Sequence, residues 1–449
     1  MKSNSFKPGV ETRYLAAKAV YATIYKGQSL RSWANKKKEL SLTPTTEKFI
    51  NSYLLGSLCW FIQNKAVLAN LLRSPIKEKD KIVEVLLCCA IYEITRMRTP
   101  NYAVVASTVE AVKMAQKNHL KSLANATLRN FIRDKEEFIT KARSSLEGLY
   151  SFPLWFIEQT KKEHPNHWQS ILDASNQIPI LWLCVNTSRI SLSEYQQQLL
   201  LHTGQKGALI YGFPNAIGVQ YDTNPAELPG FDENLFHVQT PGAQLAAEIL
   251  KPKKNDIILD ACAAPGGKAL CLFNKEKSIN LTAIEISRKR FQILEKNFSR
   301  TQLNAKLICN DLLTPDKWWN KKKFTKILLD VPCSSSAVIN RDQDIKYLRR
   351  PSDIGEYHKK QLKLLEASWR LLEKNGTLLY STCSIFSAEN SKTIKQFLTA
   401  NQDAATLVIK DVPALSIWGV IKEEKGIQLI PGKGLQDGFF YTLLHKTQQ

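Results

Sequence analysis

The chain has 449 residues, which is more than one ordinary hydrophobic core organises, so two or three domains are expected. Its 44% hydrophobic and 23% charged residues are typical of a soluble globular protein rather than a disordered one. A formal net charge of +21 favours a polyanionic partner, and nucleic acid is the commonest.

Neither a secretory leader nor a membrane span is predicted. Met1 to Lys18 lacks an apolar signal core, and the longest apolar run, Val83 to Ile94, is too short for a bilayer and contains Glu84 and Glu93. This run is predicted to be a buried helix. The chain is expected to be cytoplasmic.

The nine cysteines are scattered along the chain. No pair has CxxC spacing and no histidine cluster accompanies them, so neither a zinc site nor a disulfide framework is predicted. We expect reduced thiols and no bound metal.

Residues 1–145 are predicted to form an all-helical domain, because their apolar residues recur at helical spacing. Residues 1–150 hold 25 Lys or Arg against 12 Asp or Glu, hence +13 of the total +21. One third of the chain therefore carries most of the excess charge, which favours contact of this module with RNA or DNA.

Residues 146–248 are predicted to be a small α+β domain that binds RNA. Two segments have helical patterns and three have strand patterns. The predicted helices are Trp155–Ser175 and Leu192–His202, and the predicted strands are Ile180–Val185, Ala208–Ile210 and Ile217–Val219. Proline and glycine pairs then lead into a helix over Ala243–Leu250.

Residues 249–449 alternate between strands and helices, which predicts a parallel sheet with right-handed crossovers, an α/β domain. A long helix is predicted over Ile354–Lys374, ending at Asn375-Gly376. The predicted strands are Ile257–Leu259, Leu281–Ile284, Lys306–Ile308, Lys326–Leu329 and Thr377–Tyr380.

A small-residue loop follows the first of these strands. The strand stops at Asp260, residues 262–267 form the loop, and a helix is predicted from Lys268, as in the nucleotide pocket of a doubly wound sheet. Glu285 lies about 20 residues farther on, where an acid receives ribose hydroxyls in NAD enzymes and in S-adenosylmethionine methyltransferases. The loop lacks both GxGxxG and P-loop spacing. Because S-adenosylmethionine has no phosphate to cradle, the methyltransferase is favoured.

Two cysteines follow the last two predicted strands. Cys333 comes after Asp330-Val331-Pro332, and Cys383 comes after Ser381-Thr382. If these strands are neighbours in a parallel sheet, both thiols lie at the same edge and face one crevice.

These motifs resemble the RNA 5-methylcytosine methyltransferases of the NOL1/NOP2/Sun family, and within it the bacterial Sun branch, RsmB. The resemblance rests on motifs at the two cysteines and the loop, namely Asp260–Lys268, Asp330–Ser334 and Tyr380–Ser384, with Glu389-Asn390 and Asp437–Phe440. It implies a NusB-like helical RNA-binding domain in front, which suits Asn125 to Arg129, and a Rossmann-like class I methyltransferase domain at the C-terminus.

The implied activity is methylation of C5 of a cytosine in 16S rRNA, at position 967 for this branch, with S-adenosylmethionine as the methyl donor. The implied partner is 16S rRNA or a small-subunit precursor, and a monomer is expected. C5 of cytosine is a poor nucleophile, so a thiolate must first add to C6 and make the ring enamine-like.

The resemblance also implies roles for individual residues. Cys383 matches the nucleophile, Cys333 the cysteine that assists release of the adduct, and Asp330 a group that binds the cytosine edge. Glu285 would hold the ribose, Asp311 the adenine side, and the loop the methionine end, with Lys268 balancing nearby carboxylates. The implied cofactor-binding residues are Cys262, Ala263, Ala264, Pro265, Gly266, Gly267, Lys268, Glu285, Arg290, Asp311 and Asp330.

The chain departs from the family over Ser335–Asp344, where a glycine-containing run and Arg-Arg-His-Pro are usual, and this leaves the RNA-facing role of that loop open. Two other functions stay open. One is a non-catalytic NusB-like RNA-binding assembly or antitermination factor, against which the retained Cys333, Cys383, Asp330 and Glu285 argue. The other is a tRNA cytosine-5 methyltransferase, which the helical N-terminal module disfavours.

Overall fold

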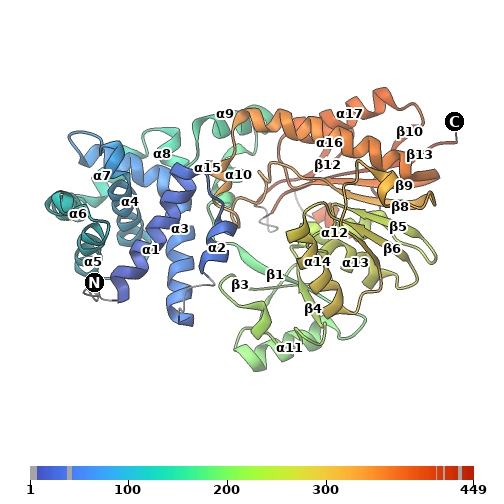
Figure 1. The fold of residues 1–449 in the computed structure, drawn as a ribbon, viewed down its shortest axis with the longest axis horizontal. Coiled ribbons are helices and arrows are strands. Elements are labelled where there is room, and N and C mark those ends of the chain that lie inside the picture. Colours follow the sequence, from blue (N-terminus) through green and yellow to red (C-terminus); the bar gives the residue numbers. More distant parts are fainter. Residues whose placement is uncertain (1–7, 38–42, 411, 418–419, 433–436, 449) are drawn as a thin grey trace. The chain divides into compact units, whose positions relative to one another are not determined.

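A computed structural model describes residues 8–37, 43–410, 412–417, 420–432 and 437–448 (Figure 1). The chain forms two compact units. The first comprises Met1–Asn176 together with Ile339–Arg350, and the second comprises Gln177–Val338 and Pro351–Gln449. The chain therefore leaves the second unit after Val338 and re-enters it at Pro351.

The first unit is all-helical in its described residues, as predicted for the N-terminal domain. Its longer helices are α1 (Pro8–Lys26), α3 (Pro44–Leu71), α4 (Lys81–Arg96), α5 (Asn101–Met114) and α6 (Lys121–Arg133). Shorter helices are α2 (Leu30–Lys37), α7 (Lys135–Ala142), α8 (Leu146–Tyr150), α9 (Leu154–Glu163), α10 (Trp168–Ser175) and α15 (Ile345–Leu348). The helix predicted over Trp155–Ser175 is thus two helices, separated at His164-Pro165.

Helix α4 is the centre of this unit. Every residue from Val83 to Ile94 is buried, which confirms the predicted buried helix. Its Glu93 accepts from Arg13 at both carboxylate oxygens, with Nε–Oε2 at 2.8 Å and Nη2–Oε1 at 2.5 Å. This bidentate pair compensates two charges that would be costly to bury alone. Among the described residues, no helix is both long and apolar enough to cross a bilayer.

The segment Ile339–Arg350 belongs to the helical unit, where Gln343 and Asp344 are buried. Gln343 Nε2 donates to Ser175 O at 3.0 Å, and Leu30 N donates to Asp344 Oδ2 at 2.9 Å. Gln343, which departs from the family pattern, and Asp344, which keeps it, therefore both hold the segment to helices far away in sequence.

Lys346 anchors the same segment. Its Nζ donates to the carbonyl oxygens of Cys59 at 3.0 Å and Ser151 at 3.2 Å, donates also to Asn176 Oδ1, and lies 4.1 Å from the centre of the Phe152 ring. Burial lowers the pKa of Lys346 to about 8. The carbonyl oxygens and the ring replace the water that the ammonium group has lost.

Replacing Lys346 by methionine should destabilise the protein by about 2–4 kcal/mol, because the stem is kept while three buried acceptors lose their donor. Urea unfolding of the full chain measures this. Lys363→Met, at an exposed position of a helix in the second unit, is the control and should change the free energy of unfolding by less than about 0.5 kcal/mol. Equal effects of the two changes would contradict the anchoring role.

The second unit begins with a small antiparallel sheet in the order β2-β3-β1-β4. Its strands are β1 (Ile180–Val185), β2 (Ala208–Leu209), β3 (Ala216–Gln220) and β4 (Phe236–Val238), with helix α11 (Leu192–Thr203) between β1 and β2. Ser191 and Glu194 form a capping box at the start of α11. The predicted α+β composition of this region is confirmed.

The larger sheet has the order β11-β12-β13-β9-β8-β5-β6-β7, with β10 paired to β13. All neighbouring pairs from β9 through β7 are parallel, whereas the pairs that involve β13 are antiparallel. The strands are β5 (Ile257–Ala261), β6 (Asn280–Ile284), β7 (Lys306–Ile308), β8 (Phe324–Asp330), β9 (Leu372–Thr382), β10 (Ala404–Leu407), β11 (Val420–Glu423), β12 (Gly426–Leu429) and β13 (Phe439–Lys446). The predicted Rossmann-like α/β fold is confirmed.

Helices cover both faces of this sheet (Figure 1). Ile258 and Leu328 pack toward α12 (Pro241–Leu250), α13 (Gly267–Lys275) and α14 (Arg288–Thr301), whereas Leu259 and Ile327 pack toward α16 (Pro351–Leu371) and α17 (Ser391–Ala400). Successive residues of a strand point to opposite faces, so a strand that is apolar throughout needs helices on both sides.

The predicted end of the long helix was wrong. Helix α16 begins at Pro351 and ends at Leu371, and strand β9 already starts at Leu372. Leu372 pairs with Phe324, and the register shifts before Thr377 pairs with Lys326. The residues 373–376 are accommodated in this irregularity, and the tertiary pairing overrides the local signal for a helix end at Asn375-Gly376.

Candidate active site

The crevice of the parallel sheet lies where the strand order reverses. From β5 the chain proceeds to β6 and β7 on one side, and then returns to β8 and β9 on the other. In such sheets ligands bind outside the carboxyl ends of the strands at this switch point. Asp330 ends one of these strands, and Cys262, Glu285, Cys333 and Cys383 follow within three residues of a strand end, as does Asp311.

The loop between β5 and α13 is shaped by residues with left-handed backbone. Cys262 has φ 64° and Gly266 has φ 105°. A Cβ at Gly266 would also lie 2.6 Å from Phe298 Cε1, so only glycine fits there. Helix α13 begins at Gly267 directly behind it, and the first-turn amides at Gly267 and Lys268 have no carbonyl partner within the helix.

Glu285 follows β6 and is buried, with 2% of the residue exposed. Its Oε1 accepts from Ser287 N at 2.9 Å, while Oε2 has no hydrogen-bond partner among the described residues and lies 3.3 Å from Arg290 Nη1. Arg290 also donates to Ala264 O, so it links Glu285 to the loop. One carboxylate oxygen is thereby left for a ligand hydroxyl.

Asp311 follows β7, and its side chain makes a local contact. Leu313 N donates to Asp311 Oδ1 at 2.9 Å, and Trp318 Nε1 donates to Asp311 O at 3.1 Å. Asp311 therefore lies just after β7, the third strand on this side of the sheet after β5 and β6, as predicted. Trp318 holds its backbone in place.

Asp260 lies at the end of β5 and is almost fully buried, and the sequence identified it only as a strand end. It is 1% exposed, and neither carboxylate oxygen has a hydrogen-bond partner among the described residues. Burial raises the pKa of Asp260 to about 8, as do the charges of Asp330 and Glu285, while Lys268 acts in the opposite direction. A buried carboxyl without a donor is a position for a ligand cation.

We expect Asp260→Asn to change how stability depends on pH. The pKa of Asp260 is about 8 in the folded protein and about 4 in the unfolded chain, so between these pH values the folded protein holds one more proton. The free energy of unfolding of the wild type therefore falls as pH rises from about 4 to about 8, by up to about 1.4 kcal/mol per pH unit. The variant lacks this term. Urea unfolding between pH 5 and 8 should therefore show the variant gaining on the wild type as pH rises, whereas the exposed control Asp316→Asn runs parallel to the wild type. A pH-independent difference for Asp260→Asn would contradict the buried proton.

Asp330 ends β8 and is held by two side chains. Lys268 Nζ lies 2.6 Å from Asp330 Oδ2, and Ser381 Oγ donates to Asp330 Oδ1 at 2.7 Å. Lys268 Nζ also lies 5.1 Å from the centre of the Phe439 ring. Lys268, which was expected to balance nearby carboxylates, forms its ion pair with Asp330.

The two cysteines predicted to share a crevice face each other. Strands β8 and β9 are parallel, with Asp330 opposite Ser381, so the residues that follow them come together. Cys333 Sγ and Cys383 Sγ are 3.3 Å apart. Cys333 is buried, whereas Cys383 is partly exposed.

The two thiols are electrostatically different. A hydrogen bond from Cys333 lowers the pKa of Cys383, and Ser335 and Lys268 act in the same direction, although burial and Asp330 oppose them. The same bond raises the pKa of Cys333, as do burial and Glu389. Cys383 is therefore the thiol that ionises first and the stronger candidate for a nucleophile.

Glu389 ties together the two loops that carry the cysteines, a role that the sequence did not reveal. It is fully buried and accepts hydrogen bonds from four groups. The donors are Ser334 N at 2.8 Å, Ser334 Oγ at 2.5 Å, Ser384 Oγ at 2.5 Å and Gln361 Nε2 at 3.1 Å. Since Ser334 and Ser384 directly follow the two cysteines, this carboxylate fixes the distance between the thiols. The only signal in the sequence is an acid six positions after the second cysteine.

Glu389→Gln should destabilise the protein by about 2–4 kcal/mol, because the amide brings a donor to a position where four donors already converge. Urea unfolding measures the loss. Glu366→Gln, at an exposed position of α16, removes the same charge without breaking a buried network and should cost less than about 0.5 kcal/mol. An unchanged urea midpoint of unfolding for Glu389→Gln would contradict the proposal that Glu389 holds the two cysteine loops together.

Three family models match successive parts of the chain. The model described as 16S rRNA methyltransferase RsmB/F matches residues 247–445, the NusB family matches residues 10–133, and the ferredoxin-like domain of RsmF/B-like methyltransferases matches residues 152–217. The NusB match lies in the helical unit, the RsmB/F match covers the larger sheet, and the ferredoxin-like match includes α9 and α10 of the helical unit together with β1, α11 and β2.

Solved structures share this fold at low sequence identity. PH0851 superposes with a TM-score of 0.79 at 22% identity, covering 99% of this chain and 100% of its own. NSun6 from Pyrococcus horikoshii, solved with SFG, gives a TM-score of 0.59 at 20% identity and covers 67% of this chain and all of its own. These likenesses concern the fold.

Curated relatives match at higher identity along almost their whole length. The probable ribosomal RNA small subunit methyltransferase B of Coxiella burnetii is 35% identical over 411 residues, which is 91% of this chain and 94% of that protein. Ribosomal RNA small subunit methyltransferase B of Vibrio cholerae is 34% identical over 437 residues, 97% of this chain and 98% of that protein. The chain therefore belongs to the ribosomal RNA small subunit methyltransferase B family.

Proposed function

We propose that the protein methylates C5 of a cytosine in 16S rRNA, with S-adenosylmethionine as donor and Cys383 as the covalent nucleophile. The observation that carries this proposal is the pair of thiols, 3.3 Å apart, at the neighbouring carboxyl ends of β8 and β9. Two thiols placed in this way beside a nucleotide crevice suit a reaction that uses one as a nucleophile and the other in release of the adduct.

The crevice fits S-adenosylmethionine by buried carboxylate oxygens that make no hydrogen bond to any described residue. Both oxygens of Asp260 and Oε2 of Glu285 are buried and without hydrogen bonds among the described residues. A donor with a cationic methionine end and a ribose diol would satisfy them, with Glu285 on the diol and Asp260 toward the positive charge. When bound, S-adenosylmethionine supplies the methyl group that C5 takes up.

The remaining steps belong to the protein. The thiolate of Cys383 forms a bond to C6, which places electron density on C5. Lys268 and Ser381 both contact the carboxylate of Asp330 and hold it in place. Asp330 is thereby positioned to bind the cytosine edge and to stabilise charge as the adduct forms. After methylation a base takes the C5 proton, the electron pair of that C–H bond restores the C5–C6 double bond, and Cys383 leaves C6 as a thiolate. Cys333 assists this release.

The substrate base must be unstacked to reach this pocket. The relatives are named for small-subunit ribosomal RNA, and the NusB-like match covers residues 10–133. The excess positive charge of residues 1–150 supports RNA as the partner of the helical unit. Position 967 of 16S rRNA remains a prediction from the family branch.

Two experiments test the proposal. The first measures transfer of labelled methyl from S-adenosylmethionine to 16S rRNA by the purified chain. The second locates the methylated position by bisulfite sequencing of RNA from a strain that lacks the gene. Loss of a single 5-methylcytosine in 16S rRNA is expected. Binding of S-adenosylmethionine in a calorimeter separates an enzyme from a non-catalytic assembly factor, for which no binding is expected. Loss of a methylated cytosine in tRNA instead would overturn the rRNA assignment.

A further inference from the structure

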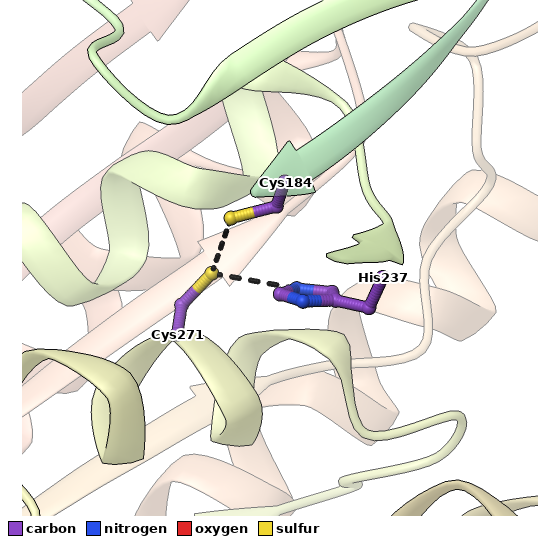
Figure 2. Close-up of side chains that lie close together, drawn as sticks. All are labelled: Cys184, His237 and Cys271. Carbon is purple, nitrogen blue, oxygen red and sulfur yellow. Dashed lines mark hydrogen bonds between the residues drawn. The ribbon is translucent and has the colours of Figure 1, made fainter. Parts of the chain in front are cut away.

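A second group of reactive side chains lies in the second unit and takes no part in the chemistry above. Cys184 on β1, His237 on β4 and Cys271 on α13 converge, with their three ligand atoms all within 4.8 Å of one another (Figure 2). Cys271 Sγ lies 3.6 Å from Cys184 Sγ and 3.6 Å from His237 Nε2. The exposed fractions of these residues are 3%, 4% and 8% in chain order, so the cluster is sealed from solvent.

The fold explains how residues so far apart in sequence meet. Cys184 and His237 are directly opposite each other in the antiparallel pairing of β1 and β4. Cross-strand partners have Cβ atoms about 5 Å apart on the same face of a sheet. Helix α13 packs on that face and adds Cys271 from the opposite side, as Figure 2 shows.

We propose that these residues bind one Zn²⁺ ion, with Cys184, Cys271 and His237 as ligands and the side-chain oxygen of Gln239 as the fourth. The proposal is independent of the methyltransferase function. It also revises the expectation of no metal, which rested on spacing along the chain and could not detect ligands that three separate elements bring together.

The distances suit a tetrahedral ion. Zn–S distances of about 2.3 Å and Zn–N distances of about 2.1 Å place two sulfurs about 3.8 Å apart and a sulfur and a nitrogen about 3.6 Å apart. The two observed distances of 3.6 Å are close to these values, and the third, between Cys184 Sγ and the ligand nitrogen of His237, lies within 4.8 Å. Gln239 Oε1 lies 2.7 Å from Cys271 Sγ and 3.0 Å from His237 Nε2, a hydrogen-bonding arrangement. It must move by about 1 Å away from the sulfur to become a ligand.

The charges balance when the ion is bound. Zn²⁺ with two thiolates and a neutral imidazole is a neutral unit, and its formation releases the protons of both thiols.

Such an ion would connect the small sheet to the methyltransferase sheet within the second unit. Its ligands come from β1 and β4 on one side and from α13 on the other, and α13 is the helix that follows the loop ending at Gly266. A fully enclosed site with four protein ligands is typical of a structural zinc rather than a catalytic one. Removal of the ion should therefore loosen the contact of α13 with the small sheet.

The test is the zinc content of the full chain, purified without chelators and measured by inductively coupled plasma mass spectrometry. About one zinc per chain is expected, and Cys184→Ser together with Cys271→Ser should reduce it at least about tenfold. Cys88→Ser removes a buried thiol of the helical unit and should leave the zinc content unchanged. Cobalt(II) exchanged into the wild type should give thiolate charge-transfer absorption, which the double variant lacks.

The wild-type measurements decide the matter even if the double variant does not fold. Absence of both zinc and the cobalt absorption in the wild type overturns the proposal, as does a Cys184–Cys271 disulfide found by peptide mapping of the protein as purified. Zinc content that is equal in the wild type and in a double variant with native circular dichroism also overturns it, because the metal is then bound elsewhere.

Discussion

Replacing Cys383 by alanine should reduce methyl transfer to RNA by about a thousandfold or more, while binding of S-adenosylmethionine persists. Without a thiolate at C6, C5 of cytosine does not become nucleophilic, whatever else the crevice holds. The pKa of Cys383 is lowered by its hydrogen bond from Cys333, which increases the share of the reactive thiolate at a given pH. Transfer by the wild type should fall as pH drops through that pKa.

Two further variants make the result specific. Cys383→Ser keeps the size of the side chain but supplies a hydroxyl that does not ionise near neutral pH, so it should be as inactive as alanine. Cys88→Ala removes a buried thiol from α4 in the helical unit and should keep full activity. Transfer by Cys383→Ala at more than about a tenth of the wild-type rate would rule out the covalent mechanism.

The parts of the site that the sequence could predict are those fixed by the parallel sheet. Each strand is a short β-branched or apolar run, and the residue type at its carboxyl end stands out against that background. Once strands are neighbours in one sheet, their ends share an edge, so the meeting of Cys333 and Cys383 followed from topology alone. No knowledge of side-chain packing was needed.

The parts that it could not predict depend on packing between elements distant in sequence. No local pattern distinguishes Lys346 from the other lysines of the chain, and only the carbonyl groups that surround it make it a buried anchor. Cys184 and His237 meet through the register of β1 against β4, which the sequence does not encode in any local pattern. The end of α16 was wrong for the same reason, since pairing of Leu372 with Phe324 extends β9 backwards.

Replacing Cys333 by alanine should trap the covalent protein–RNA adduct, whereas replacing Cys383 should prevent its formation. The Cys383–C6 bond still forms and C5 is still methylated, but loss of the C5 proton and rupture of the Cys383–C6 bond are slowed. A covalent protein–RNA species should therefore accumulate and survive a denaturing gel, as a slow band that ribonuclease and protease each remove. Turnover should fall by about a hundredfold or more.

The double variant decides whether this band is the proposed adduct. If Cys383 forms the bond, then Cys333→Ala with Cys383→Ala gives no slow band, because the nucleophile is gone. If the band persists in the double variant, another residue bonds RNA and the roles of the two thiols are wrong. The two sulfurs are 3.3 Å apart, and the pKa of Cys383 is the one that is lowered. A slow band that appears when Cys333 is replaced, and disappears when Cys383 is replaced as well, therefore assigns attack to Cys383 and release to Cys333.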